Sequence, residues 1–455
     1  MKLYVVEISK YVIAILSVLF ALCGFIALKF KSEKKRTPLY ILQIIMQVII
    51  LVLCFVTIVL RTGKLNYIFY GIGIALILSC LILLFSAFFP DGNRLIINNA
   101  AFLIMTSVIM LMRIDSGKAI RQMVIAGISI AVMFACCEIV YKLPILTNLT
   151  WVYAILGAVL LGVVIICGSI TNGSYISFTL FGVTFQPSEF VKLIFIFFLS
   201  CVLCRAATIK EAAITFGVAL VYILILMVSR DLGASAILFI IYLAMLFVAS
   251  RNPAYLLGGI GFGMVGAIAG FILFRHVRVR VQAWLDPWST IESTGYQLTQ
   301  SLFGISSGGW FGLGLFKGNP QTIPYVEDDF IFSAIAEEFG IIYGISLILV
   351  VLSMFLMILL EASRLRDRWS KYVDCGIAVW LIFQTFLTVG GGSKFIPLTG
   401  VTLPLVSYGG TSLMVTMLSI GVYEATCLIR VDEHYEAIER YRQAQAMEAG
   451  RFEEQ

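Results

Sequence analysis

The sequence predicts an all-α protein that crosses a membrane many times. Hydrophobic residues make up 60% of the 455-residue chain and charged residues only 13%, with a mean hydropathy of +1.01. Apolar runs of about 20 residues, the length that spans a bilayer as a helix, recur from end to end. Because these runs are continuous rather than alternating, they favour helices over a β-barrel.

We predict about thirteen spans from these runs. They are expected at residues 5–28, 39–60, 66–89, 97–113, 122–141, 150–170, 188–205, 211–229, 231–250, 254–274, 329–360, 373–392 and 411–429. The basic segments KFKSEKKR (29–36) and RLRDRWSK (364–371) then fall on one side of the membrane. Positively charged loops mark the cytoplasmic side, so the N-terminus is expected outside and the polar, helix-prone C-terminal tail inside.

Charge and composition exclude several function classes. The net charge of +6 is explained by the basic topology segments, so we predict no nucleic-acid partner. Two histidines, His276 and His434, are too few for a histidine-rich metal site or a histidine-based triad. The ten cysteines lie in or beside apolar runs, which is typical of packed free thiols rather than disulfides.

Three polar or irregular stretches are expected on the outer side, at 171–188, 275–328 and 393–410. Loops carried by a rigid scaffold commonly hold functional residues. We therefore expect the functional site where these three stretches meet, with 275–328 as the longest of them.

Within the longest stretch, RHVRVR (275–280) places three arginines at the outer end of a span, against the positive-inside bias. They are Arg275, Arg278 and Arg280. One guanidinium group can bind two phosphate oxygens at once, which favours capture of a phosphate-bearing ligand. The alternative is that these side chains extend to headgroups of the outer leaflet.

Other segments admit both a functional and a structural interpretation. SSGGWFGLGLFKG (306–318) could offer backbone N–H groups to an anion or form a re-entrant turn. QPSEFVK (186–192) opens a span, and Glu189 and Lys192 can pair on one helix face. That pair is either functional or a structural ion pair at the interface. Asp231, at the start of another span, is explained by the helix dipole.

The segment YVEDDFIFSAIAEEFG concentrates negative charge beside an apolar run. Glu327, Asp328 and Asp329 stand at its mouth, and two further acids follow within it. A carboxylate beside lipid and near other carboxylates has a raised pKa, which suits a general base. The alternative is an acidic helix cap. Adjacent acids inside a span are costly, so a buried polar partner is expected for Glu337 and Glu338.

These segments together resemble the SEDS family of proteins for shape, elongation, division and sporulation. FQPSEFVK, DLGAS, RV…WLDPW…GYQLTQSL, SSGGWFGLGL, DDFIFSAIAEEFG and PLTGVTLPLVSYGGTS occur in the family's order and spacing over about residues 95–430. The resemblance implies a core of about ten spans. It divides the chain into extra N-terminal helices at 1–92, a SEDS-like core at 93–430 with 275–328 as a large extracytoplasmic loop, and a cytoplasmic tail at 431–455.

The resemblance implies a peptidoglycan glycosyltransferase of the bacterial cytoplasmic membrane. Members of the family polymerise lipid II, a disaccharide-pentapeptide on undecaprenyl pyrophosphate, at the outer membrane face. Asp329 matches the family's catalytic aspartate and would deprotonate the 4-hydroxyl of the acceptor sugar, which attacks the anomeric carbon of the donor and expels the lipid pyrophosphate. The implied substrate-binding residues are Glu189, Lys192, Arg275, Arg278, Arg280, Gln297, Gln300 and Ser407.

The same resemblance implies a cofactor and partners. A divalent cation, Mg²⁺ or Mn²⁺, would neutralise the leaving group; no dedicated metal site is expected, and Asp328 and Glu327 are the candidate ligands. No organic cofactor is expected. The expected partners are membrane lipids and a class B penicillin-binding protein with transpeptidase activity. The alternative functions are a flippase for the lipid-linked precursor and a non-catalytic scaffold of the cell-wall synthesis complex.

The sequence departs from the family pattern at four places. Glu327-Asp328 replaces the usual His-Thr before the catalytic aspartate, which makes the site more acidic. Ile176-Ser177 replaces Arg-Trp, Thr290-Ile291 replaces Asp-Pro, and Thr388 replaces Asn. We therefore expect a divergent member with altered donor-site detail, whose role in elongation, division or sporulation is open.

Overall fold

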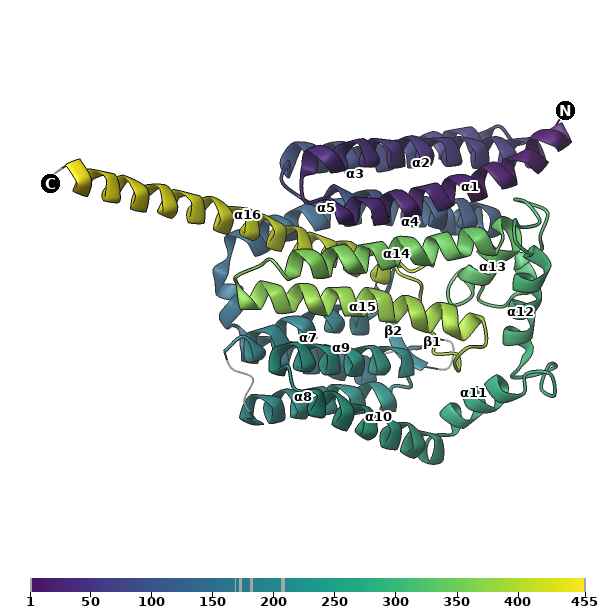
Figure 1. The fold of residues 1–455 in the computed structure, drawn as a ribbon. Coiled ribbons are helices and arrows are strands. Elements are labelled where there is room, and N and C mark those ends of the chain that lie inside the picture. Colours follow the sequence, from purple (N-terminus) through teal and green to yellow (C-terminus); the bar gives the residue numbers. More distant parts are fainter. Residues whose placement is uncertain (1, 168, 172–173, 181–182, 206–208, 454–455) are drawn as a thin grey trace.

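The computed structural model describes residues 2–167, 169–171, 174–180, 183–205 and 209–453. Its α-helices are α1 (Lys2–Lys29), α2 (Glu33–Thr62), α3 (Asn66–Phe88), α4 (Arg94–Ile114), α5 (Ser116–Lys142), α6 (Thr150–Cys167), α7 (Pro187–Leu203), α8 (Ile209–Val228), α9 (Leu232–Ser250), α10 (Pro253–Leu273), α11 (Arg275–Leu285), α12 (Tyr296–Gly308), α13 (Ile331–Phe339), α14 (Ile341–Ala362), α15 (Arg368–Gly392) and α16 (Gly410–Glu453). The other elements are the 3₁₀ helices η1 (Pro144–Asn148) and η2 (Pro320–Thr322) and the strands β1 (Ser169–Thr171), β2 (Ser174–Leu180) and β3 (Val183–Phe185). The long helices lie side by side as one bundle (Figure 1).

Eleven of the described helices are long and apolar enough to cross a membrane. They are α1 to α5, α8, α9, α10, α14, α15 and α16. The predicted polytopic helical class is therefore confirmed. The predicted spans 150–170 and 188–205 are also helical, as α6 and α7. The apolar part of α6 that the structure describes is Thr150–Val163, and α7 has 17 residues, so both are shorter than a full span.

Two details of the predicted fold are wrong. The stretch 171–188, expected to be polar or irregular in an all-α protein, includes most of a small antiparallel sheet in the order β1-β2-β3, whose first strand begins at Ser169, inside the predicted span 150–170. The segment 329–360 is not one span, because the chain turns between α13 and α14 at Gly340, whose φ is 87°. A Cβ at Gly340 would lie 2.3 Å from Gly312 N, so the turn requires glycine there.

The N-terminal helices pack directly on the rest of the bundle. Helix α1 packs on α2 and α14, while α2 and α3 pack on α4. The apolar part of α4 is consequently fully buried, whereas that of α10 is only 6% buried. Polar contacts cross the junction, from Asn98 Nδ2 to the Tyr40 carbonyl (3.2 Å) and from Ser17 Oγ to Ser346 Oγ (3.2 Å). Such contacts give helix association inside a membrane its specificity.

The segments predicted to carry function gather at one end of the bundle. Figure 1 shows α11, α12 and α13 at the end opposite the protruding part of α16. The predicted large loop 275–328 is itself folded, since it contains α11, α12 and η2. The predicted polar tail forms the C-terminal part of α16, which continues as a helix to Glu453.

Candidate active site

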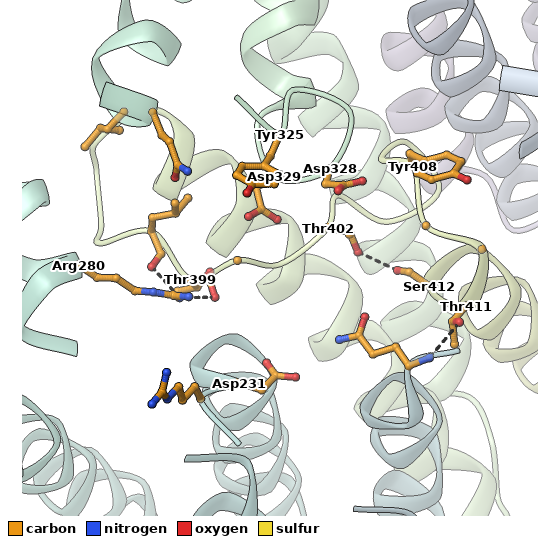
Figure 2. A pocket seen from close by; sticks show the side chains of 18 of the residues that line it. Asp231, Arg280, Tyr325, Asp328, Asp329, Thr399, Thr402, Tyr408, Thr411 and Ser412 are labelled. Atoms are coloured by element: carbon orange, nitrogen blue, oxygen red, sulfur yellow. Dashed lines mark hydrogen bonds between the residues drawn. The ribbon is translucent and has the colours of Figure 1, made fainter. Parts of the chain in front are cut away.

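A cavity of about 970 Å³ lies where the three predicted polar stretches meet. Gln186 comes from the first stretch, residues from Val279 to Tyr325 come from the second, and residues from Leu398 to Gly410 come from the third. Helix α5 and the start of α9 complete the wall; Asp231, at the start of α9, is labelled in Figure 2. The predicted convergence is confirmed, and the volume suits a ligand of substantial size.

Asp328 and Asp329 line this cavity from a tight turn that precedes α13. Tyr325 starts the turn with a positive φ of 54°, and its carbonyl accepts from Asp328 N at 3.1 Å. Ser407 Oγ donates to the Asp328 carbonyl (2.5 Å), and Tyr408 N donates to the Glu327 carbonyl (2.8 Å). The turn is thus held by its own hydrogen bonds and by the neighbouring segment, with both aspartates at the cavity (Figure 2).

Both aspartates have raised pKa values. Burial raises the pKa of Asp329 to about 6; the Arg280 guanidinium opposes the rise and the Asp231 carboxylate adds to it. Burial raises the pKa of Asp328 to about 7, and the carboxylates of Asp329 and Glu327 add to the rise. A carboxylate that titrates near neutral pH is suited to accept a proton, so this turn has the electrostatics that a general base needs.

The third acid of the cluster, Glu327, is neutralised by a distant partner. Its carboxylate accepts a hydrogen bond from Lys118 Nζ of α5. The same ammonium lies 5.6 Å from the centroid of the Tyr408 ring. Sequence reasoning did not point to Lys118, which is 209 positions from Glu327. Of the three consecutive acids, therefore, Asp328 and Asp329 are the ones that present charge to the cavity.

The structure brings one arginine of the predicted triplet to the cavity. Arg280 lines it and donates from Nη1 to the carbonyls of Leu398 (3.2 Å) and Thr399 (2.8 Å). Arg275 and Arg278 are exposed on α11 and do not line the cavity. Successive helix residues point about 100° apart, so α11 cannot turn all three side chains toward one site.

The other predicted substrate-binding residues divide in the same way. Gln297 of α12 lines the cavity, whereas Gln300 does not. Ser407 lies behind the cavity wall, where its hydroxyl holds the Asp328 carbonyl. The polar groups that can reach a ligand are therefore fewer than the sequence suggested.

Glu189 and Lys192 form a buried ion pair behind the cavity. Lys192 Nζ lies 2.7 Å from Glu189 Oε2 and donates to Gln384 Oε1 at 2.8 Å. The ammonium also lies 4.8 Å from the centroid of the Trp380 ring. Neither charged side chain lines the cavity, so this pair supports the site from α7 without reaching a ligand in it.

Asp231 is a cavity residue whose position the sequence explained only by the helix dipole. Its Oδ1 does cap α9, accepting from Ala234 N at 2.9 Å. Its Oδ2 accepts from Ser188 Oγ (3.0 Å), next to the buried Glu189, and the carboxylate lines the cavity (Figure 2). One residue thus connects the buried ion pair to the site. The available cue was its place beside Arg230 at a span end expected on the outer side.

The glycine-rich loop (309–319) binds the chain's own carboxylates. Phe316 N donates to Glu338 Oε2 (3.0 Å). Asn319 N donates to Glu337 Oε1 (2.6 Å). Arg113 Nε donates to Glu338 Oε1 at 2.7 Å and supplies the buried polar partner expected for this acid. These N–H groups, considered above for a ligand anion, instead fold the loop against α13.

The described residues contain no group of three or more His, Cys, Asp and Glu side chains arranged to hold a metal ion. Asp328 and Asp329 nevertheless put two adjacent carboxylates on the cavity wall. Mg²⁺ is commonly held by one or two carboxylates together with substrate phosphates. The residues therefore fit a cation that is shared with a phosphate-bearing ligand rather than one enclosed by protein.

The positions that depart from the family pattern have different structural roles. Thr388 Oγ1 donates to the Val401 carbonyl (2.8 Å) and so ties α15 to the segment that walls the cavity. Thr290 lies in the turn between α11 and α12. The side chains of Ile176 and Ser177 lie outside the part of the chain whose side chains are described.

Comparison with known sequences gives one family match and several relatives. The family model described as "Cell cycle protein", FtsW/RodA/SpoVE, matches residues 94–428. Peptidoglycan glycosyltransferase RodA of Mycobacterium tuberculosis (strain ATCC 25618 / H37Rv) is 33% identical over 268 residues, covering 55% of this chain and 57% of that protein. The probable peptidoglycan glycosyltransferase FtsW of Aeromonas salmonicida (strain A449) is 34% identical over 291 residues, covering 61% of this chain and 72% of that protein. The match thus spans little more than half the length of the mycobacterial relative.

Two solved structures have a similar fold. A chain from "Structural coordination of polymerization and crosslinking by a peptidoglycan synthase complex" aligns with a TM-score of 0.64 and 23% identity, covering 74% of this chain and 98% of that chain. The crystal structure of the rod shape determining protein RodA of Thermus thermophilus aligns with a TM-score of 0.57 and 23% identity, covering 74% and 97%. Residues 1–93 lie outside the family match.

Proposed function

Because the chain belongs to the FtsW/RodA/SpoVE family of cell cycle proteins, the SEDS family that its motifs resemble, we propose that it is a peptidoglycan glycosyltransferase that polymerises lipid II. The observation that carries the proposal is the cavity lined by Asp328, Asp329 and Arg280, in which both carboxylates titrate near neutral pH. The glycosyltransferase names of relatives at 33% and 34% identity support it.

In the proposed reaction, Asp329 accepts the proton of the acceptor sugar's 4-hydroxyl group. The hydroxyl oxygen forms a bond to the anomeric carbon of the donor, and the bond from that carbon to the pyrophosphate oxygen breaks. Undecaprenyl pyrophosphate leaves with the electron pair of the broken bond. Arg280 balances the negative charge that develops on it, and the carbonyls of Leu398 and Thr399 keep the guanidinium in place.

The α5 wall of the cavity suits the lipid part of this substrate. Ile120, Val124 and Ile128 line the cavity and are 38%, 59% and 50% exposed. Residues four apart lie on one face of a helix, so these side chains form an apolar strip along a membrane-spanning segment. We infer that the undecaprenyl chain lies along this strip while the pyrophosphate lies near Arg280.

A divalent cation fits the same arrangement as a shared ligand of the pyrophosphate. Asp328 would hold it, and the ion would supply charge neutralisation for the leaving group. Glu327, the other candidate from the sequence, is occupied by Lys118. Proton acceptance by Asp329 and charge balance by Arg280 remain the work of the protein's own side chains.

We propose that the cavity faces the outside of the cytoplasmic membrane. The basic segments 29–36 and 364–371 support this orientation, because they lie at one end of the bundle: Arg36 Nη2 is 3.6 Å from Glu361 Oε1 at the end of α14. The polar part of α16 is at the same end, where Glu433 accepts from Asp367 N at 3.0 Å. We propose a class B penicillin-binding protein as partner, and the similarity to a chain from a complex that coordinates polymerization and crosslinking supports a crosslinking partner.

Polymerisation in detergent tests this function against both alternatives. Micelles have no two sides, so a flippase gives no product in them and a scaffold gives none under any condition. We expect purified protein with labelled lipid II to form glycan strands and release undecaprenyl pyrophosphate, in reactions with and without Mg²⁺ and with and without the partner. Absence of strands from folded protein under all four conditions would contradict the proposal.

The rate should depend on pH through Asp329. Its pKa is about 6 in the folded protein, and only the deprotonated form accepts a proton. We expect kcat/KM to rise about tenfold per pH unit below about pH 6 and to level off above it. Because Arg280 lowers the pKa of Asp329, Arg280→Met should move the rising limb to higher pH. A pH profile of the wild type and this variant checks the sign, and a shift to lower pH would contradict it.

The Lys118–Glu327 pair should matter for substrate binding. Lys118→Met leaves an unpaired carboxylate next to a cavity that takes a pyrophosphate, so we expect KM to rise about fivefold with kcat little changed. Glu327→Gln alone should have a small effect, and the double variant should recover a KM near that of the wild type. Steady-state kinetics of the four proteins measure the coupling; additive effects would mean that Lys118 acts independently of Glu327.

A further inference from the structure

Helix α1, which lies outside the family match, contacts the glycine-rich loop that packs against α13. Its packing partners are α2, α14 and α13. Near its start, Glu7 accepts from Lys317 Nζ of the glycine-rich loop and also lies 2.5 Å from Lys10 Nζ. One turn further on, the ring of Tyr11 packs against that of Phe311, with centroids 5.0 Å apart. Two separate contacts, one charged and one aromatic, therefore join α1 to this loop.

The same loop is fastened to α13 through the main chain. Leu313 N donates to the Glu337 carbonyl and Gly314 N to the Glu338 carbonyl, both at 2.9 Å. Gly312 fits closely against the same helix end, because a Cβ there would lie 2.2 Å from the Glu338 carbonyl oxygen. With side-chain bonds from both glutamates as well, the loop and α13 form one hydrogen-bonded unit.

Helix α13 also fixes the tight turn that carries Asp329. It begins at Ile331, two residues after Asp329. The Phe330 carbonyl accepts from Ser333 N (3.0 Å), and Ser333 Oγ lies 2.6 Å from Ser301 Oγ of α12. A shift of α13 would therefore change the direction from which the Asp329 carboxylate enters the cavity.

From this chain of contacts we infer that α1 is a positioning element for Asp329, with Glu7 and Tyr11 acting through the glycine-rich loop and α13. The inference rests on the proposed role of Asp329 as the base and gives α1 a function in that reaction. Neither Glu7 nor Tyr11 lines the cavity, so both are positioning residues rather than catalytic ones.

The charged contact is suited to tuning position rather than to stabilising the fold. The side chains of Glu7 and Lys317 are 41% and 30% exposed. Ion pairs with this exposure contribute about 0–1 kcal/mol to the free energy of unfolding. Loss of the contact should therefore leave the bundle folded while the loop gains freedom, which separates positioning from stability.

The test compares Lys317→Met, Tyr11→Ala and the double variant with two matched controls. Tyr4→Ala removes a 74% exposed ring from the same helix. Lys142→Met breaks the exposed pair with Glu138 on α5. Hydrogen exchange of residues 309–339 is measured without substrate, and kcat and KM are measured with labelled lipid II.

We expect Lys317→Met and Tyr11→Ala each to speed hydrogen exchange in the loop and in the first turn of α13. Each should also lower kcat about twofold to fivefold with KM unchanged. The double variant should fall short of the product of the two effects, because both act through the same loop. Lys317→Arg should restore kcat.

Exchange and kcat equal to those of Tyr4→Ala and Lys142→Met would overturn the inference and leave α1 as a packing element. If the wild type forms no polymer, the proposed function fails, and the exchange measurement still decides whether α1 holds the loop. Faster exchange in the loop with unchanged kcat would also overturn it, because the loop would then move without moving the base.

Discussion

Asp329→Asn should reduce polymerisation by about 10²- to 10⁴-fold, the usual contribution of a general base. The amide keeps the size of the side chain but cannot accept the proton of the acceptor hydroxyl. The loss should appear in kcat, because the substrate still meets Arg280 and the apolar strip of α5. Initial rates with labelled lipid II at saturating substrate measure the effect.

The same variant should be no less stable than the wild type. The pKa of Asp329 is raised in the folded protein to about 6, from about 3.9 for an unperturbed aspartate. The protonated form therefore favours folding below about pH 4, and this contribution is lost as pH rises through about 6. We expect Asp329→Asn to raise the melting temperature at pH 8 and to have little effect at pH 4. A variant that melts lower at pH 8 would mean that its lost activity reports misfolding.

Lys192→Met should have the largest effect on stability. It leaves the Glu189 carboxylate, buried on α7, without its counter-ion, and removes the contacts with Gln384 and Trp380. Breaking a buried pair by removing one partner costs about 3–5 kcal/mol of unfolding free energy. Thermal unfolding in detergent, followed by tryptophan fluorescence, measures the change.

Two variants separate this cause from a general loss of packing. In Lys192→Met/Glu189→Met neither member of the pair leaves an unpaired buried charge, so stability should return toward that of the wild type. Lys142→Met, which breaks an exposed pair, should cost no more than about 0.5 kcal/mol. A double variant as unstable as the single one would show that the ammonium's packing, and not its charge, is what the site needs.

Much of the fold followed from the sequence because hydropathy fixes which segments can cross a membrane. The turn at Gly340 was missed, since an apolar run does not show that its interior glycine must fit against Gly312. The sheet of β1 to β3 was missed because short strands in a polar stretch carry little pattern. Both errors concern contacts between segments rather than the segments themselves.

The candidate site was predictable to the extent that it depends on order along the chain. The motif around Asp329 and the convergence of three stretches placed the cavity. Helix faces and long-range pairs were not predictable: α11 turns Arg280, and not Arg275, toward the cavity, and Glu327 meets Lys118 from α5. These choices are made by packing between elements distant in sequence.

The central claim is that this cavity polymerises lipid II with Asp329 as the base. The measurement that tests it most directly is the glycan product formed from labelled lipid II by the wild type, Asp329→Asn and Asp328→Asn under identical conditions. We predict strands from the wild type, none from Asp329→Asn, and reduced strands from Asp328→Asn that extra Mg²⁺ partly restores. Strands of equal length and yield from the wild type and Asp329→Asn would contradict the claim and move the base to another group, with Asp328 the first to test.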